Sequence, residues 1–258
     1  MIEFIVCVLA GLLAGFGTGF AGLSAAVFIA PMLITSLHVD SFTAIGVALA
    51  SDVLASAASA ITYYRNGNTA LRKVRPLLYM VLAFAVVGTV ISYIFTDMSM
   101  GEHIMGWWLL LAMLALGIKL LVFPANRASD GNTLFHLPGM LVMLLGGVYI
   151  GFVCGFQGTG GGLMLLFVMN IVLGIDFKKS VGSSVTIMSL TALIGAVSHF
   201  FLHGIPEIRL LVICVIFTFA GAAVAARIAN RIDKTILKRL TGGLMTVAGV
   251  IMFIAKVV

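Results

Sequence analysis

The sequence predicts an all-α polytopic membrane protein built from two inverted repeats, each with a glycine-broken, folded-back segment and three transmembrane helices. Three observations support this prediction. First, 62% of the 258 residues are hydrophobic and only 9% are charged, whereas soluble domains carry about 25% charged residues. Second, two uncharged stretches are too long for a single span, and they match each other in sequence. Third, lysine and arginine gather in a few short loops, as in proteins that obey the positive-inside rule.

Single spanning helices account for most of the apolar chain, because about 20 apolar residues cross a bilayer. The remaining two stretches, Phe4–Leu37 and 137–175, contain no charged residue and have glycine clusters near their middles. A straight helix over the 34 residues of the first stretch would be about 51 Å long, but the hydrocarbon core is about 30 Å thick. Each stretch must therefore fold back, either as a re-entrant loop or as two full crossings. The expected single spans are 42–64, 77–96, 104–123, 180–202, 208–226 and 240–257.

The two long stretches also repeat each other at an offset of 136 residues. GFGTGFAG (15–22) aligns with GFVCGFQG (151–158) at five of eight positions, and Asp40 then aligns with Asp176 without a gap. This match indicates two homologous halves. We expect a first repeat over 1–123, a cytoplasmic linker over 124–136 and a second repeat over 137–258.

Charge placement predicts the relative orientation of the halves. Loops 65–76 and 227–239 are rich in lysine and arginine and should be cytoplasmic, whereas loop 97–103 has two acidic residues and no lysine or arginine and should be outside. Loops 65–76 and 227–239 can lie on the same side of the membrane only if segment 137–175 enters the membrane and returns to the side from which it came. The same rule applied to 4–37 places the N-terminus outside. Each half then makes three single crossings besides its folded-back segment, and this odd number inverts one half relative to the other.

Glycine breaks at corresponding positions of inverted repeats are typical of secondary transporters. Irregular backbone at membrane depth is tolerated only where it is buried in protein or lines a cavity. Glycine permits such a turn, and the half-helix after it directs unpaired N–H groups and a positive dipole end towards the cavity. Two such ends near the membrane centre would suit a small anion.

The two breaks resemble the paired signature of a known family. AGFGTGFAGLSAAVFIAPML (14–33) and IGFVCGFQGTGGGLMLLF (150–167) are similar to the motifs of the sulfite exporter TauE/SafE family, also called the toluene-sulfonate uptake permease family. One departure is that Ser24, Ala25 and Ala26 stand where that family usually has glycines. The resemblance covers nearly the whole chain. It implies a carrier of small sulfur-containing anions, such as sulfite or sulfonates, in the bacterial inner membrane.

The candidate substrate site consists of small and polar residues at the two breaks and on the helix that follows each break. Close helix packing is the alternative role for the glycines, and ordinary interhelical hydrogen bonding is the alternative for the hydroxyls. The candidate residues are Gly19, Gly22, Ser24, Ser51, Gln157, Gly158, Thr159, Gly160, Gly161, Gly162, Ser183 and Thr186.

Asp52 is the one acidic residue inside a predicted span. It lies near the membrane centre, where a charged side chain costs about 2.5–3.5 kcal/mol. With Ser56, Ser59 and Tyr63 it forms a polar stripe at helical spacing. We expect a role in proton coupling or gating, with a structural hydrogen bond to a neighbouring helix as the alternative. Its counterpart in the second half is Met188, so the repeat itself does not require an acid.

The sequence favours a secondary transporter of small sulfur-containing anions over an enzyme. It has no phosphate-binding loop, no metal-ligand spacing and no nucleophile–base pair in a short window, so no cofactor or metal is expected. The net charge of +6 does not indicate nucleic-acid binding, because the basic residues lie in loops between apolar runs. The expected partners are a small anion and the lipid bilayer, and proton coupling and a homo-oligomer are both compatible with the sequence. The alternative function is an integral membrane assembly factor or enzyme without transport activity.

Overall fold

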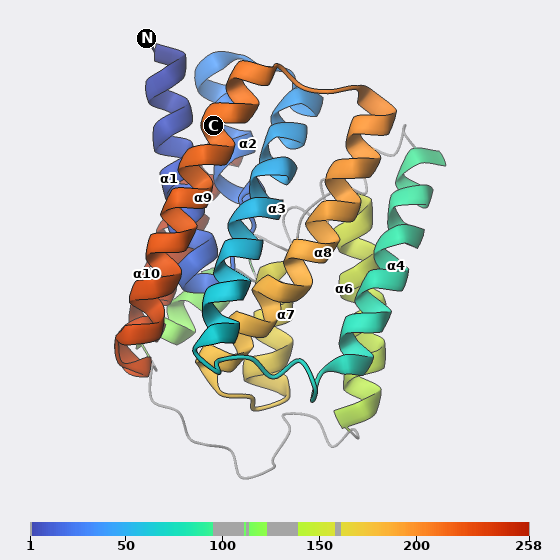
Figure 1. Ribbon diagram of the computed structural model, residues 1–258, viewed down its shortest axis with the longest axis vertical. Coiled ribbons are helices and arrows are strands. Elements are labelled where there is room, and N and C mark those ends of the chain that lie inside the picture. Colours follow the sequence, from blue (N-terminus) through green and yellow to red (C-terminus); the bar gives the residue numbers. More distant parts are fainter. Residues whose placement is uncertain (1, 95–110, 112–113, 123–138, 158–160, 258) are drawn as a thin grey trace.

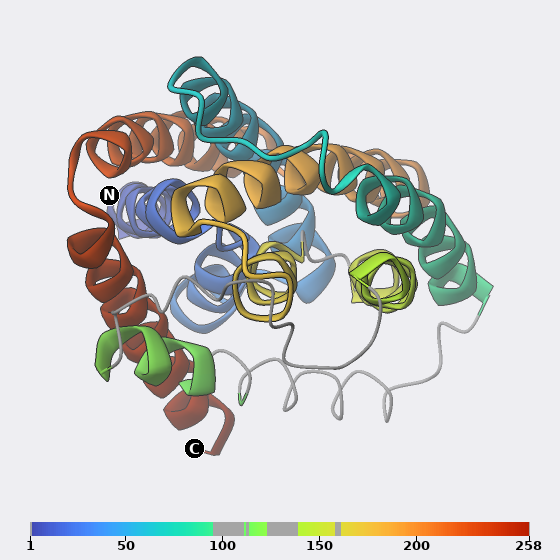
Figure 2. The ribbon, with the colours of Figure 1, turned by 90° about the horizontal axis from the view of Figure 1, so that it is seen from below.

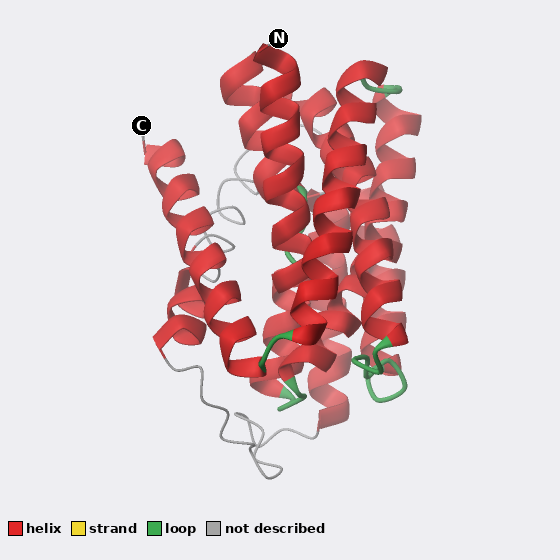
Figure 3. Ribbon diagram, turned by 60° about the vertical axis from the view of Figure 1, so that its left-hand side comes forward, coloured by secondary structure: helices red, strands yellow, loops and turns green. Residues whose placement is uncertain are grey.

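The computed structural model describes residues 2–94, 111, 114–122, 139–157 and 161–257. Within these residues every regular element is a helix, and loops join the helices (Figure 3). Five of the described helices are long and apolar enough to cross a membrane, which confirms the predicted all-α membrane class. In chain order the elements are α1 (Ile2–Ala21), α2 (Ala26–Leu37), α3 (Ser41–Arg65), α4 (Arg75–Ile94), α6 (Gly139–Gln157), α7 (Gly162–Phe167), the π-helix η1 (Val168–Val172), α8 (Phe177–His203), α9 (Ile208–Arg231) and α10 (Lys234–Val257).

Both long uncharged stretches are broken at their glycine clusters. The first breaks between α1 and α2, and the second breaks between α6 and α7. In Figure 1, α1 descends from the top end and α2 returns towards it, whereas α6 rises from the bottom end and α7 returns towards that end. The two folded-back segments therefore enter the molecule from opposite ends.

The returning arms are too short to cross a bilayer. α2 has 12 residues, which gives a length of about 18 Å at 1.5 Å per residue. α7 and η1 have 6 and 5 residues. Since the hydrocarbon core is about 30 Å thick, both arms begin inside the protein, and the segments are re-entrant rather than pairs of full crossings. Seen end-on, α7 lies in the interior of the bundle (Figure 2).

Several helices extend beyond the apolar runs that predicted them. α10 begins at Lys234, although the apolar run begins at residue 240, and α9 continues to Arg231 past the run that ends at 226. Hydropathy identifies only the part of a helix that lies in the hydrocarbon core. The helix continues beyond this part, because backbone hydrogen bonds also form at charged residues whose long side chains reach water. The expected span 104–123 is described only in part, with helix at 114–122, and the linker 124–136 lies outside the described residues.

The first arm of each folded-back segment packs on a distant helix. α1 packs most extensively against α9, and α6 packs most extensively against α4. At the offset of 136 residues found in the sequence, α4 corresponds to α9. Each broken segment therefore packs on a helix of the other half, and these two helices are equivalent in the repeat. This reciprocal packing supports the predicted division into two repeats, which stays a prediction.

The two ends of the molecule differ in their basic residues. The N-terminus of α1 and the turns after α2 and α8 lie at the top in Figure 1, and the turns after α3, η1 and α9 lie at the bottom. Most of the described basic residues flank the bottom turns: Arg65, Arg72, Lys73, Arg75, Lys178, Lys179, Arg227, Arg231, Lys234, Lys238 and Arg239. By the positive-inside rule we expect the bottom end to be cytoplasmic.

This orientation predicts a labelling pattern for two exposed positions. In a background without native cysteines, Thr235→Cys at the bottom end should react with an impermeant maleimide only after the membrane is permeabilised. Ser36→Cys at the top end should react in intact spheroplasts. Both positions are exposed, so access to the reagent is decided by the side of the membrane. Labelling of Thr235→Cys from the outside of intact spheroplasts would contradict the orientation.

Candidate functional site

Three glycines of α1 form the contact surface with α9. They are Gly11, Gly15 and Gly19, spaced four residues apart on one face of the helix. A Cβ atom on Gly15 would overlap the carbonyl oxygen of Thr218, and one on Gly19 would lie 2.5 Å from the Cβ of Ala225. Glycine is therefore required here for close approach of two helices. Gly19, a candidate substrate residue, lies in this packing surface.

The same arrangement occurs in α6. Gly147, Gly151 and Gly155 face α4, and they occupy the positions equivalent to the three α1 glycines at the 136-residue offset. A Cβ on Gly155 would overlap the carbonyl oxygen of Ala85, and one on Gly151 would lie 2.9 Å from the Cα of Val81. The structure thus assigns the regularly spaced glycines before each break to helix packing.

The glycines at the breaks themselves have a different environment. Gly22 and Gly161 have positive φ angles of 66° and 62°, a region that side chains other than glycine rarely adopt. A Cβ on Gly162 would overlap the carbonyl oxygen of Gly22 and lie 2.6 Å from the Sδ of Met188. The backbones of the two breaks are therefore in direct contact, although 140 residues separate Gly22 from Gly162. The folded-back segments meet at their turning points.

Asp52 of α3 lies beside the first break. Its side chain is fully buried, and its Oδ2 accepts a hydrogen bond of 2.6 Å from the hydroxyl of Ser24. The Ser24 hydroxyl also accepts from the backbone N–H of Ala26 at the start of α2, at 3.3 Å. The backbone amide of Ala25 interacts with the same carboxyl group. The other oxygen, Oδ1, has no well-aligned hydrogen-bond donor among the described residues.

This contact explains Ser24, one of the three residues at which the first break departs from the glycine pattern. A serine at position 24 supplies the hydroxyl that joins the start of α2 to Asp52, which a glycine could not do. In the second half, Met188 takes the position equivalent to Asp52 and lies against Gly162 at the start of α7. The two breaks thus have equivalent geometry but different chemistry, one acidic and one apolar.

The polar stripe predicted on α3 is buried as a whole. Ser51 and Ser56 donate to backbone carbonyls of their own helix, at Val47 and Asp52. Tyr63 donates to the carbonyl oxygen of Gly19 at 3.0 Å, which ties α3 to the last turn of α1. The Ser59 hydroxyl is buried without a hydrogen-bond partner among the described residues. Buried polar groups are normally paired, so Asp52 Oδ1 and Ser59 Oγ, the buried side-chain atoms of the described residues that lack such a partner, are candidates for binding a ligand or water.

The two candidate hydroxyls of α8, those of Ser183 and Thr186, have different hydrogen-bond partners. Ser183 accepts a hydrogen bond of 2.7 Å from the backbone N–H of Ala70 in the α3–α4 loop, so it anchors that loop rather than facing the breaks. Thr186 donates to the carbonyl of Gly182 in its own helix. Ser184, which was not among the candidate residues, has its Oγ 2.7 Å from the position of a Cβ on Gly22 and so lies against the first break. Its place in a run of serines and threonines gave no signal that separated it from Ser183.

Some candidate positions cannot be placed. Gly158, Thr159 and Gly160 lie outside the described residues, as does the side chain of Gln157. Among the residues that the structure does describe, no group of three His, Cys, Asp or Glu side chains could hold a metal ion. The described part of the site therefore consists of backbone turns, serine hydroxyls and a single carboxyl group. Such groups can bind a small polar solute and a proton.

Comparisons with known proteins agree with this architecture. The family model for "Sulfite exporter TauE/SafE" matches residues 7–252. The chain is also similar to "Probable membrane transporter protein YdhB" of Bacillus subtilis (strain 168), with 26% identity over 244 residues, which is 92% of this chain and 94% of that protein. No solved structure matches the chain. With a family model that spans both helix breaks and nearly every described helix, this chain belongs to the TauE/SafE sulfite exporter family of membrane transporters.

Proposed function

We propose that this protein is a secondary transporter of small sulfur-containing anions, such as sulfite or sulfonates, in the bacterial inner membrane. The substrate binds between the two helix breaks, near the centre of the membrane. The observation that carries the proposal is the contact between Gly22 and Gly162, which joins the turning points of two re-entrant segments in a chain of this family. Transporters of inverted-repeat architecture bind their substrates where such discontinuous helices meet.

The chemistry around the breaks supports a small polar solute rather than a large or apolar one. Ser24 and Ser184 bring hydroxyl groups to the first break, and positive-φ glycines turn the backbone at both breaks, Gly22 at the first and Gly161 at the second. A helix break at membrane depth provides N–H groups that can donate hydrogen bonds to a transported oxyanion. No full counter-charge is then needed in the bilayer.

Asp52 gives the proposed transporter a site for a coupled proton. The membrane potential, negative inside, drives an anion outward by about 2.3 kcal/mol per charge per 100 mV. Import therefore needs a co-transported cation or a steep concentration gradient, while export needs neither. The buried carboxyl group of Asp52 accepts a hydrogen bond from Ser24 at the first break, and there it is placed to take up a proton when substrate binds.

Flux measurements with the purified protein test this function. Proteoliposomes that contain the protein should take up labelled sulfite or a labelled sulfonate with saturable kinetics, and unlabelled anion of the same kind should compete. Protein-free liposomes and liposomes that contain an unrelated membrane protein serve as controls. Absence of saturable flux for sulfite, sulfoacetate and an aromatic sulfonate would contradict the proposal and favour an assembly factor or enzyme without transport activity.

A further inference from the structure

A large cavity lies at the cytoplasmic end, away from the helix breaks. Its volume is about 760 Å³. The α3–α4 loop forms one wall, and the start of α6 and the η1–α8 turn form the others. We call this cavity the cytoplasmic vestibule. Its lining residues with charged side chains are Arg72, Lys73, Asp176 and Lys179.

The lining has an excess of positive charge. Asp176 is paired with Lys234 of α10 at 2.6 Å. Partial burial raises the pKa of Asp176, but the hydrogen bond and the charge of Lys234 outweigh this effect and hold the pKa below its ordinary value. The carboxylate is therefore ionised and neutralised by its partner at neutral pH. Three exposed cationic side chains, Arg72, Lys73 and Lys179, remain without a neutralising carboxylate in the described lining.

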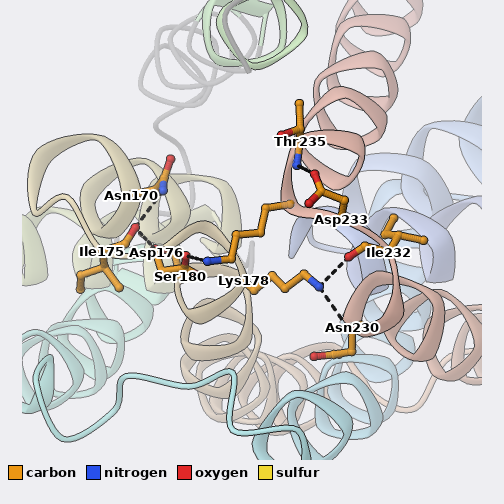
Figure 4. Close-up of polar contacts among 10 residues, drawn as sticks. Asn170, Ile175, Asp176, Lys178, Ser180, Asn230, Ile232, Asp233 and Thr235 are labelled. Atoms are coloured by element: carbon orange, nitrogen blue, oxygen red, sulfur yellow. Dashed lines mark hydrogen bonds and ion pairs between the residues drawn. The ribbon is translucent and has the colours of Figure 1, made fainter. Parts of the chain in front are cut away.

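The walls of the vestibule are held in place by hydrogen bonds. The backbone N–H of Ala70 donates to Ser183, which fixes the α3–α4 loop on α8. In the opposite wall, Asn170 and Ser180 both donate to the carbonyl oxygen of Ile175 (Figure 4). Just outside the lining, Lys178 donates to the carbonyls of Asn230 and Ile232 at the end of α9. The cavity is thus a preformed feature of the fold, with fixed backbone beneath its charged side chains.

An apolar layer separates the vestibule from the second break. The apolar part of its lining includes Leu71, Val74 and Met143, and these residues belong to one continuous hydrophobic cluster. The same cluster contains Cys154 and Met164, which lie beside the turn at Gly161 and Gly162. The vestibule therefore opens to the cytoplasm, and its floor is the apolar packing that encloses the break.

The equivalent positions at the outer end carry less positive charge. At the 136-residue offset, Arg72 corresponds to Ile208, Lys73 to Arg209 and Lys179 to Thr43. Glu207 lies next to these outer positions, so the outer end has little net charge there. The two ends therefore differ in charge at equivalent positions, with the excess of positive charge at the vestibule.

We propose that the cytoplasmic vestibule is a collecting site for oxyanions, in which Arg72, Lys73 and Lys179 bind the anion before it passes the apolar layer to the helix breaks. This inference rests on the proposed transport function and adds a second, lower-affinity site at one side of the membrane. Guanidinium and ammonium groups are the usual ligands of oxyanions. A cleft lined by one sign of charge raises the local concentration of its counter-ion by focusing the field.

Charge removal at the vestibule should change the kinetics at one membrane face only. The test variant is Arg72→Gln/Lys73→Gln/Lys179→Gln. The control, Arg227→Gln/Arg231→Gln/Arg239→Gln, removes the same number of exposed charges from the same end outside the vestibule. Inside-out vesicles present the cytoplasmic face to labelled sulfite, and right-side-out vesicles present the other face. For the test variant we expect KM at the cytoplasmic face to rise by about 5-fold or more, with KM at the outer face unchanged.

A binding measurement separates this proposal from the transport proposal. An impermeant amine-reactive reagent is applied to inside-out vesicles with and without sulfite, and the modification of each lysine is followed by mass spectrometry. Sulfite should protect Lys73 and Lys179 but not Lys234, which lies outside the lining and is 57% exposed. Protection without flux would support the vestibule and contradict transport of sulfite. An equal rise of KM in the control variant, or flux without protection and without a change of KM, would overturn the vestibule proposal.

Discussion

Replacement of Gly162 with alanine is expected to lower substrate flux about 5-fold or more, since overpacking costs about 1–3 kcal/mol and 1.4 kcal/mol is a factor of ten. The added Cβ would overlap the carbonyl oxygen of Gly22 and press on the sulfur of Met188. A flexible side chain can move away from such a contact, but a backbone carbonyl at the turn of a second re-entrant segment cannot. The two breaks must separate, and the proposed substrate site between them changes shape.

Gly146→Ala is the matched control for this variant. Gly146 lies in the same broken segment, and the identical change there would place a Cβ at ordinary contact distances of 3.7 and 3.8 Å from the methyl groups of Val168. Flux should therefore stay near that of the wild type. Both variants are compared at equal amounts of monodisperse protein, so that loss of flux is separated from loss of folded protein. Wild-type flux in Gly162→Ala would show that the contact between the breaks has no role in transport.

Replacement of Asp52 with asparagine is expected to abolish uptake driven by a pH gradient while exchange of substrate for substrate continues. Asparagine has nearly the same size and keeps an oxygen that can accept the hydrogen bond from Ser24, but it cannot bind a proton. Exchange at equal pH needs no net proton movement, so it does not require the acid. The measured quantity is the ratio of gradient-driven uptake to exchange, in wild type and variant, at matched protein levels.

Ser24→Ala separates the proton from the hydrogen bond. This variant removes the 2.6 Å contact to Asp52 but keeps the carboxyl group. If Asp52 couples the proton, Ser24→Ala should retain gradient-driven uptake at a reduced rate, and only Asp52→Asn should lose it. If Asp52 is purely structural, both variants should lower uptake and exchange together. An unchanged ratio in Asp52→Asn would remove this residue from the coupling mechanism and leave the anion to move down its electrical gradient.

The role of each glycine shows where sequence patterns stop being informative. The sequence alone predicted that 4–37 and 137–175 would break at their glycine clusters, because no straight helix of that length fits a bilayer. It did not separate glycines that pack helices from glycines that turn the chain. Gly15 and Gly22 look alike in sequence, yet one touches α9 and the other touches α7 and α8. Only the neighbouring helix decides between these roles, and α9 lies about 200 residues away along the chain.

The polar residues show the same division. Helical spacing correctly placed Asp52, Ser56, Ser59 and Tyr63 on one buried face of α3, because a charge at membrane depth must face the protein interior. The partner of Asp52 was not predictable, since Ser24 is joined to it only by the return of α2 alongside α3. Serine hydroxyls serve equally well as helix–helix hydrogen bonds, loop anchors and ligands, so their type does not specify their role.

The sequence by itself determined the properties that depend on local composition and on counting. These are the membrane class, the breaks in the two long uncharged stretches, the gathering of basic residues in a few loops, and the resemblance to the family to which the chain belongs. Only the tertiary structure decided which backbones meet at Gly22 and Gly162, which hydroxyl reaches Asp52, and how Arg72, Lys73 and Lys179 come to line one cavity. The physical reason is that hydropathy reports the transfer of each residue from water to lipid, whereas these contacts depend on packing between helices that are distant in the chain.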